Sequence, residues 1–226
     1  MKKGIIIFGL LGLIIIGGFY AKRKYYDPRH RLETAKKEVR KLADNNEIMN
    51  GDLIFQTSLS RQSKAIQLAT KSKYSHCGLI YKDGKDFYVF EAVQPVKLTS
   101  LDKWIARGQD GKFVIKRLKN ADQVLTPSVI EKMREVGDQF KGKNYDLTFE
   151  WSDDKIYCSE LIWKIYQRAT GLKIGRLQKL KDFDLTDKAV QTKMKERYGD
   201  KIPMDETVIS PISIYDSDLL MTVKSN

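Results

Sequence analysis

The chain of 226 residues is short of cysteine and histidine, with two of each. Its cysteines, Cys77 and Cys158, form no CxxC pair of the kind that binds structural zinc, and they could make at most one disulfide. No internal repeat and no low-complexity segment is present. The chain is long enough to bury a core of its own, so disulfide staples are not needed.

Acidic residues are outnumbered, with 29 Asp and Glu against 41 Lys and Arg and a net charge of +12. Such a charge favours anionic partners, which include nucleic acid, acidic lipid headgroups and anionic wall polymers. The basic residues are spread along the whole chain, and no RNA-binding, zinc-finger or helix-turn-helix signature accompanies them. We therefore expect an anionic polymer or lipid surface as a partner, and no nucleic acid.

Residues 4–21 form an uncharged apolar run that is long enough for a membrane-spanning helix. A cleaved signal peptide is the alternative, but cleavage after Ala21 would put Phe19 at a position where the peptidase favours small residues. The pattern therefore favours a single-pass anchor within residues 1–21. Basic residues follow the run more densely than they precede it, which favours a cytoplasmic body.

Two further segments follow the apolar run. Residues 22–47 are predicted to be a basic amphipathic connector, with a helix from Asp27 to about Asp44 that begins with Asp-Pro. Residues 48–226 are predicted to be one domain in which β-rich runs alternate with amphipathic helices, and therefore an α+β domain.

A hairpin turn centred on Asp83 and Gly84 would place His76 directly opposite Glu91. Opposed side chains have Cβ atoms about 4.5 to 5.5 Å apart, so a carboxylate there can hold a ring nitrogen of the imidazole. His30 lies in the connector, which leaves His76 as the only histidine of the domain. The register predicts a base and its orienting acid, and a structural cross-strand pair is the alternative.

Cys158 stands at the start of a predicted helix, where free amide groups and the helix dipole favour a thiolate. Cysteine, histidine and an acid form a nucleophile, a base and an orienter. A buried structural cysteine is the alternative. Because neighbours on a strand face opposite sides, Cys77 is expected to point away from Cys158 if His76 points towards it. That geometry would exclude a disulfide and a zinc site.

Six short motifs, taken in order, resemble the YiiX-like cysteine hydrolases. They are GDLIF (51–55), SHCGLIY (75–81), the Glu of FEAV (91), NYD (144–146), YCSELIW (157–163) and SPISI (210–214). These hydrolases are the circularly permuted branch of the NlpC-type, papain-like superfamily, in which the histidine precedes the cysteine, as His76 precedes Cys158 here. The likeness covers about residues 48–223.

The resemblance implies a permuted papain-like α+β fold, with the cysteine helix packed against a small antiparallel sheet. It implies that Cys158 is the nucleophile, His76 the general base and then acid, and Glu91 the third polar residue. Tyr145 is then a possible oxyanion or substrate contact, although an aromatic that packs on the helix is equally expected. The chain departs from the family at Cys77, where an apolar residue is more usual.

These features predict a thiol-dependent hydrolase of the peptidase or amidase type, without a metal or cofactor. It would act by thioester acyl transfer on amide bonds of cell-wall or other small peptides. The alternatives are a lipid or fatty-acyl hydrolase or acyltransferase on the same scaffold, and a non-catalytic binding module. YiiX-like relatives are often exported, so the resemblance implies an extracytoplasmic catalytic domain, against the distribution of basic residues.

Overall fold

The computed structural model describes residues 27–226. The predicted anchor or signal segment, residues 1–21, lies outside the described residues. Within the described part of the chain, no helix is long and apolar enough to cross a membrane.

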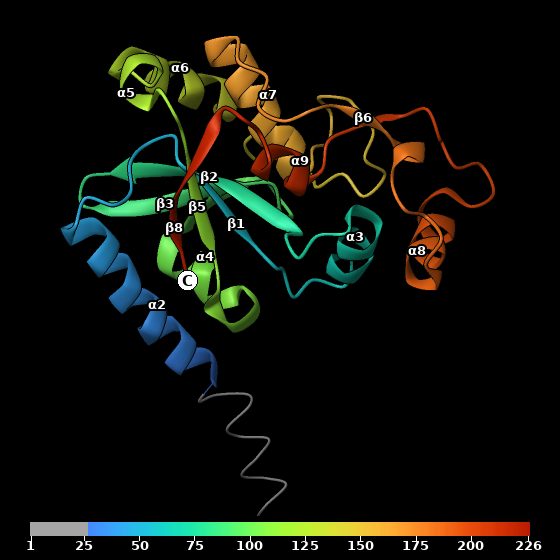
Figure 1. Ribbon diagram of the computed structural model, residues 1–226, viewed down its shortest axis with the longest axis horizontal. Coiled ribbons are helices and arrows are strands. Elements are labelled where there is room, and N and C mark those ends of the chain that lie inside the picture. The colour runs from blue at the N-terminus through green and yellow to red at the C-terminus, as the bar shows by residue number, and fades with distance from the viewer. Residues whose placement is uncertain (1–26) are drawn as a thin grey trace, which may run out of the picture.

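A six-stranded antiparallel sheet forms the centre of the fold, in the order β4-β3-β2-β1-β5-β8 (Figure 1). Its strands are β1 (Leu53–Gln56), β2 (His76–Asp83), β3 (Asp86–Glu91), β4 (Lys97–Ser100), β5 (Val114–Leu118) and β8 (Leu220–Ser225). A separate two-stranded sheet pairs β6 (Gln178–Lys179) with β7 (Thr207–Val208). The predicted α+β fold with an antiparallel sheet is confirmed.

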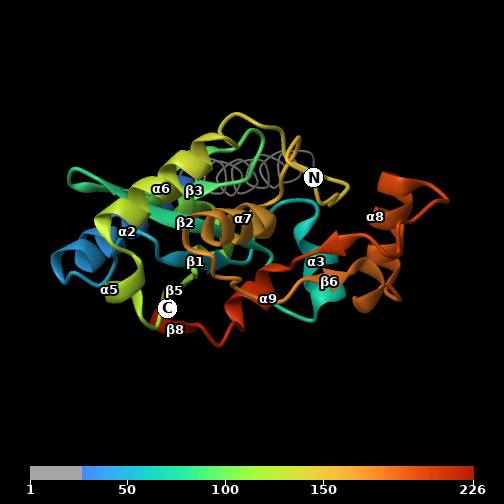
Figure 2. The ribbon, with the colours of Figure 1, turned by 90° about the horizontal axis from the view of Figure 1, so that it is seen from above.

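The helices lie on both faces of the large sheet and beside it. They are α2 (Asp27–Asp44), α3 (Ser63–Thr70), α4 (Leu101–Arg107), α5 (Ala121–Val124), α6 (Pro127–Asp138), α7 (Cys158–Thr170), α8 (Lys188–Tyr198) and α9 (Pro211–Tyr215). Short 3-10 turns follow α4 and β6, at Gln109–Gly111 and Leu180–Asp182. In two views at right angles, α6, α7 and α9 cover one face of the sheet and α2 and α4 the other (Figures 1 and 2).

The ends of the main helices follow from local sequence. Thr126 caps α6, because its hydroxyl accepts a hydrogen bond from the amide of Val129, and Pro127 follows at the first helical position. Gly171 ends α7 in the left-handed region with φ of 80°. Glycine adopts this conformation at little energetic cost because it has no Cβ. The helix that will present Cys158 is therefore bounded as the sequence predicts.

Alternation along the strands divides the core into two layers. Cys77 and Leu79 of β2 face α7, whereas Ile80 faces α2 and α4. The connector helix α2 takes part in the second layer, where Leu42 is fully buried. Burial of one leucine side chain contributes roughly 1.5–3 kcal/mol. The connector helix is therefore packed on the body rather than held away from it.

The hairpin between β2 and β3 has a different register from the predicted one. Asp83 pairs with Asp86, and Ile80 pairs with Val89, so the turn is centred on Gly84 and Lys85. Gly84 has a positive φ of +59°, and the φ of Lys85 is not positive. This pattern matches a type II′ turn with glycine at its first central position. The predicted turn was wrong by one residue, and the facing pairs moved by two. An even shift leaves every side chain on its predicted face.

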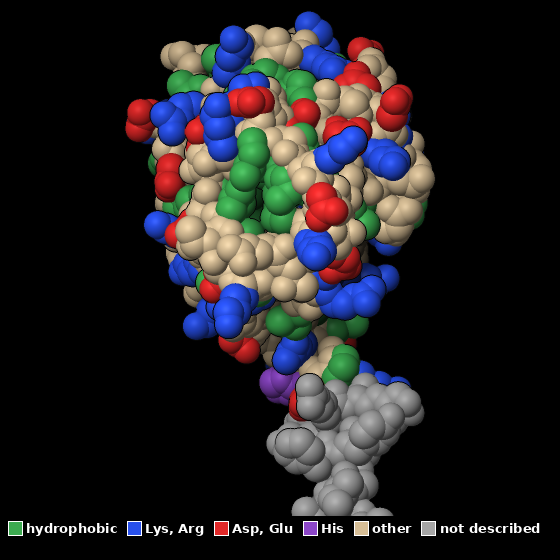
Figure 3. All heavy atoms as spheres, turned by 90° about the vertical axis from the view of Figure 1, so that its right-hand side faces the viewer, with side chains coloured by type: hydrophobic (Ala, Val, Ile, Leu, Met, Phe, Trp, Pro, Cys, Tyr) green, Lys and Arg blue, Asp and Glu red, His purple; other side chains and the backbone are tan. Residues whose placement is uncertain are grey.

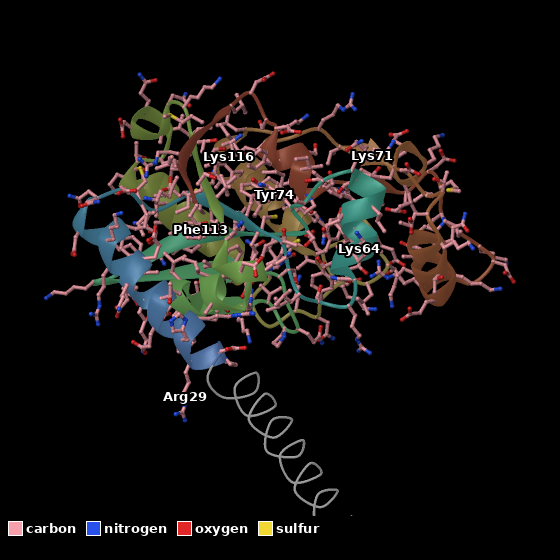
Figure 4. All side chains as sticks on the ribbon, turned by 60° about the horizontal axis from the view of Figure 1, so that its bottom comes forward. Arg29, Lys64, Lys71, Tyr74, Phe113 and Lys116 are labelled. Atoms are coloured by element: carbon pink, nitrogen blue, oxygen red, sulfur yellow. The ribbon has the colours of Figure 1, made fainter. Side chains whose placement is uncertain are left out.

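A third layer lies beside the sheet, where α8 packs on α3 (Figure 1). Its small core is formed by Leu180, Val190 and Met194. Lys64 of α3 and Lys71, which follows its last residue, are exposed (Figure 4). This layer stands next to the start of α7 and forms one wall of the site described below.

Candidate active site

Glu91 is the most tightly held side chain of the site. It is fully buried, and four donors bond its carboxylate: His76 Nε2 at 2.6 Å, Trp104 Nε1 at 2.9 Å, Thr99 Oγ1 at 2.6 Å and Arg107 Nη2. Three of these donors meet at Oε2, and Thr99 bonds Oε1. The predicted contact of Glu91 with His76 is present. The other three donors were missed by sequence reasoning.

Helix α4 supplies two of the four donors, Trp104 and Arg107. The helix lies on the second face of the sheet, and the ring of Trp104 stacks on that of His76 with centroids 5.9 Å apart and planes at 26°. The stacking and the hydrogen bond from Nε2 together fix the orientation of the imidazole. Because Nε2 is bonded to Glu91, the contact with Cys158 is left to Nδ1.

Cys158 is the first residue of α7 and is 2% exposed. The side chain of the preceding residue, Tyr157, does not cap the amides of the first helical turn. Two bonds to Ile209 hold this helix start in place: Ser159 Oγ donates to its carbonyl at 2.8 Å, and its amide donates to Tyr157 Oη at 3.0 Å. The segment around SPISI thus supports the helix end that carries the thiol.

The surroundings of Cys158 favour the thiolate. A hydrogen bond from the Cys77 thiol lowers the pKa of Cys158 well below its usual value, although burial opposes the charge. The hydrogen bond and the positive charge of His76, and the backbone amide of Cys77, lower it further. The pKa of Cys77 moves the other way, because burial and the neighbouring charge on Cys158 both raise it. One thiol of the pair is therefore a nucleophile candidate and the other stays protonated.

The imidazole is held in its charged form. Burial disfavours the charge of His76, but hydrogen bonds to Cys158 and Glu91 outweigh it and raise its pKa to about 9. Burial also disfavours the charge of Glu91, yet the hydrogen bond and charge of His76 and the charge of Arg107 bring its pKa down to about 2. The site thus holds a thiolate–imidazolium pair backed by a carboxylate–guanidinium pair over the neutral pH range.

The expected orientation of Cys77 was wrong. Cys77 and Cys158 belong to the same buried cluster on the α7 side of the sheet, and both are free thiols that contact each other. His76 is the first residue of β2, where the pairing of β2 with β1 ends. From there its ring reaches Cys158 from the other face of the sheet. Alternation holds along the strand, but it does not separate the two faces at the end of the sheet.

Tyr145 lies where two cavities meet, since it lines both of them. Burial and the charge of Cys158 raise its pKa well above the usual value, against a hydrogen bond with Gln62. The hydroxyl therefore stays protonated and can donate. The amide of Tyr145 donates to Gln94 Oε1 at 2.7 Å, which ties the NYD segment to the loop after β3.

The first cavity is apolar and has a volume of about 90 Å³. It runs from Cys158 between α3 and α8, and its walls include Ile66, Met194 and Ile209. Figure 3, seen from the side of α3 and α8, shows hydrophobic side chains around a hollow. The second cavity, of about 550 Å³, opens at His76 on the other side of Tyr145.

The fold and site define a class. A cysteine at the start of a helix packed on an antiparallel sheet, with a histidine and its acid on earlier strands, is the arrangement of a circularly permuted papain-like protein. The family comparison agrees: the chain belongs to the family described as permuted papain-like amidase enzyme, YaeF/YiiX, C92 family, whose model matches residues 47–224. The predicted family and permuted fold are confirmed.

Two relatives share most of their length with this chain. The uncharacterized protein YiiX of Escherichia coli strain K12 is 51% identical over 173 residues, which cover 76% of this chain and 84% of YiiX. The crystal structure of metalloprotein YiiX from Escherichia coli O157:H7 matches with a TM-score of 0.76 and 49% identity, and covers 80% of this chain and 98% of that one.

The relative of known structure is called a metalloprotein, which raises the question of whether the donor groups of this chain could hold a metal ion. Among residues 27–226, no group of three or more His, Cys, Asp or Glu side chains is arranged to do so. The ring of His76 is engaged by Glu91 and Cys158, and the Glu91 oxygens by four donors. The described residues of the site therefore do not fit a bound metal.

Proposed function

We propose that this protein is a thiol-dependent amidase that removes an apolar acyl group from an amine. The thiolate of Cys158 attacks the amide carbonyl, and the oxyanion that forms accepts hydrogen bonds from the amide of Cys158 and the hydroxyl of Tyr145. His76 gives its Nδ1 proton to the leaving nitrogen as the C–N bond breaks. An acyl thioester and a free amine result.

Hydrolysis then completes the cycle. Neutral His76 accepts a proton from water, and the resulting hydroxide equivalent attacks the thioester. The C–S bond breaks, a carboxylic acid leaves, and the thiolate–imidazolium pair returns. Glu91 keeps the imidazole in place and favours its charged form in both half-reactions.

The apolar cavity that begins at Cys158 is the observation that carries this proposal. Its lining is almost wholly carbon, from α3, α8 and the segment around Ile209, so a polar peptide side chain would lose hydrogen bonds to water on entry. An acyl chain loses none and removes apolar surface from water. This contrast favours acyl amides over the cell-wall peptides that the resemblance suggests.

The size of the cavity limits the chain it accepts. A volume of about 90 Å³, at about 30 Å³ for each water-sized group, has room for roughly three such groups. A methylene is of similar size. We therefore expect turnover to rise with acyl length up to a short chain, with about three carbons beyond the carbonyl, and then to level off or fall.

The test compares fluorogenic amides with acyl chains of increasing length, hydrolysed by the full chain in detergent. Wild type should cleave them with a short-chain optimum, and Cys158→Ala should abolish cleavage while the unfolding midpoint stays near that of wild type. Ala65→Leu narrows the cavity and should move the optimum to shorter chains. Ala189→Leu on the exposed side of α8 is the matched control and should leave it unchanged.

Two results would contradict this function. Cleavage of wall peptides without cleavage of any acyl amide would favour the peptidase reading. A thiol at Cys158 that reacts with iodoacetamide as slowly as an ordinary cysteine, together with no turnover, would favour a binding module.

We further infer that residues 1–21 anchor the protein to a membrane, with the catalytic domain on the extracytoplasmic side. The uncharged run of residues 4–21 and the positive net charge support an anchor at an anionic lipid surface. In the first turns of α2, Arg29 points away from the folded body (Figure 4). The protein should stay in the membrane fraction through a high-salt wash, and a C-terminal reporter fusion should locate the domain; a soluble, shortened chain would show a cleaved signal instead.

A further inference from the structure

The second cavity receives the leaving amine if the acyl group occupies the first. It lies on the far side of Tyr145 from the apolar cavity and is bounded by His76, the group that would protonate the leaving nitrogen. Its polar walls are formed by Ser58, Ser60, Gln62 and Gln94, together with Arg107. The lining of the second cavity is mostly carbon, but it carries a larger share of polar groups than that of the first, as fits the amine half of an amide substrate with a polar substituent.

Charge in the second cavity has one sign. Arg107 and His76 are its only ionisable side chains apart from Tyr145, and no acidic residue is among its lining residues. Neutral hydrogen-bonding side chains make up the rest of the polar wall. Such a cavity favours an anionic group over a cationic or neutral one.

Arg107 has unused donors. Its side chain is 38% exposed, and its hydrogen bond to Glu91 uses Nη2, which also lies 3.4 Å from His76 Nε2. Among the described residues, no hydrogen bond engages Nη1 or Nε, so these N–H groups remain for a ligand. Because Nη1 and Nε lie on different edges of the guanidinium, a carboxylate would accept from one of them together with the second N–H of Nη2, which gives the two-bond fork that its oxygens match.

We propose that Arg107 selects substrates whose leaving amine carries a carboxylate, so that the substrate class is an N-acyl amino acid with an apolar acyl group. In such a molecule one carbon separates the leaving nitrogen from the carboxylate. The nitrogen faces His76 and the carboxylate meets Arg107 beside it. This inference rests on the proposed amidase function and names the second half of its substrate.

The pairing of Arg107 with Glu91 does not cancel this role. Glu91 is fully buried behind His76 and already accepts bonds from Trp104 and Thr99, whereas the guanidinium is partly open to the cavity. The imidazolium supplies a second positive charge to the same carboxylate. Neither Glu91 nor Cys158 lines the second cavity, whereas Arg107 and His76 do, so the groups of the cluster that face the cavity are the positive ones.

The experiment compares N-butanoylglycine with N-butanoylglycinamide, which differ only in the carboxylate. The full chain should cleave the acid with a kcat/KM about tenfold or more above that of the amide, as expected for a hydrogen-bonded charge pair. Arg107→Gln should remove this preference, and Arg107→Lys should restore part of it. Lys103→Gln, an exposed change on the same helix, is the control and should keep the wild-type ratio.

The ratio separates recognition from positioning. If Arg107 only holds Glu91, Arg107→Gln lowers cleavage of both compounds by one factor and leaves the ratio intact, which overturns the inference. Equal cleavage of both by wild type overturns it as well.

If neither compound is cleaved, calorimetric binding to Cys158→Ala decides. A preference for the acid that Arg107→Gln abolishes supports the site even where the amidase function fails. Binding without a preference for the acid overturns the inference.

Discussion

Replacing Glu91 with glutamine tests the electrostatic core of the site. The amide keeps the size of the side chain and can place its oxygen where His76, Trp104 and Arg107 converge, with its NH₂ group towards the hydroxyl of Thr99, which can accept. The fold should therefore survive. What is lost is the negative charge next to the imidazolium.

The expected magnitude follows from charge separation. Two unit charges about 4 Å apart interact by about 4 kcal/mol at the effective dielectric constant of protein sites, and one pKa unit corresponds to about 1.36 kcal/mol. The variant also leaves Arg107 as an uncompensated positive charge 3.4 Å from Nε2. Because Cys158 still favours the imidazolium, we expect the pKa of His76 to fall from about 9 by roughly one to three units.

The assay is the pH dependence of kcat/KM on the best acyl amide. In wild type the rate should fall on the basic side near pH 9, where His76 loses its proton. In Glu91→Gln this fall should occur at least about one unit lower. Adding Arg107→Gln removes the uncompensated charge and should move it part of the way back. A basic limb that does not move in Glu91→Gln would refute the reasoning and reduce Glu91 to a steric support.

Two further predictions concern other buried groups. Tyr145→Phe should lower kcat by about 10²-fold with little change in KM, because one oxyanion donor is lost; loss of stability with unchanged kcat would instead indicate a packing role. Glu160 is fully buried, and burial raises its pKa to about 8 despite Lys164 at 2.7 Å. Between the unfolded value near 4.5 and about 8, only the folded state keeps this proton, so stability should fall with rising pH by at most about 1.4 kcal/mol per unit. Glu160→Gln should flatten that slope in urea unfolding at pH 5 and pH 8, and an unchanged slope would contradict the assignment.

The sequence was sufficient for the backbone that carries the site. Helical spacing and capping residues define α2, α6 and α7, and alternating apolar runs define β2 and β3. The contact of His76 with Glu91 was predicted from a register that is wrong by two residues, and it survived because an even shift preserves faces and a long carboxylate reaches a diagonal neighbour. The hydrogen bond between His76 and Glu91 is therefore present although the turn from which it was predicted is misplaced by one residue.

The remaining site residues depend on tertiary placement. Trp104 and Arg107 reach Glu91 only because α4 folds across the sheet, and no local pattern in a seven-residue helix specifies that contact. The available signal was an acid within the apolar run FYVFEAV, since an acid that such a strand buries needs several donors. The catalytic roles of Cys158 and His76 stay predictions until the variants are measured.

Cys77 shows where strand alternation is a poor guide, and it provides a last test. Its thiol hydrogen-bonds to Cys158 from the α7 face, while His76 reaches the same sulfur around the end of the strand. Cys77→Ala removes the thiol donor but keeps the backbone amide, so the pKa of Cys158 should rise while most turnover at the optimum remains.

The measurement is the pH dependence of inactivation by iodoacetamide, which reads the thiolate of Cys158 directly. The acid limb should move to higher pH in Cys77→Ala and return towards wild type in Cys77→Ser, whose hydroxyl restores a donor. Loss of one small buried side chain should cost roughly 1 kcal/mol of stability. An acid limb shared by wild type and Cys77→Ala would show that His76 and the helix end alone set the thiolate, and that the second thiol only fills space.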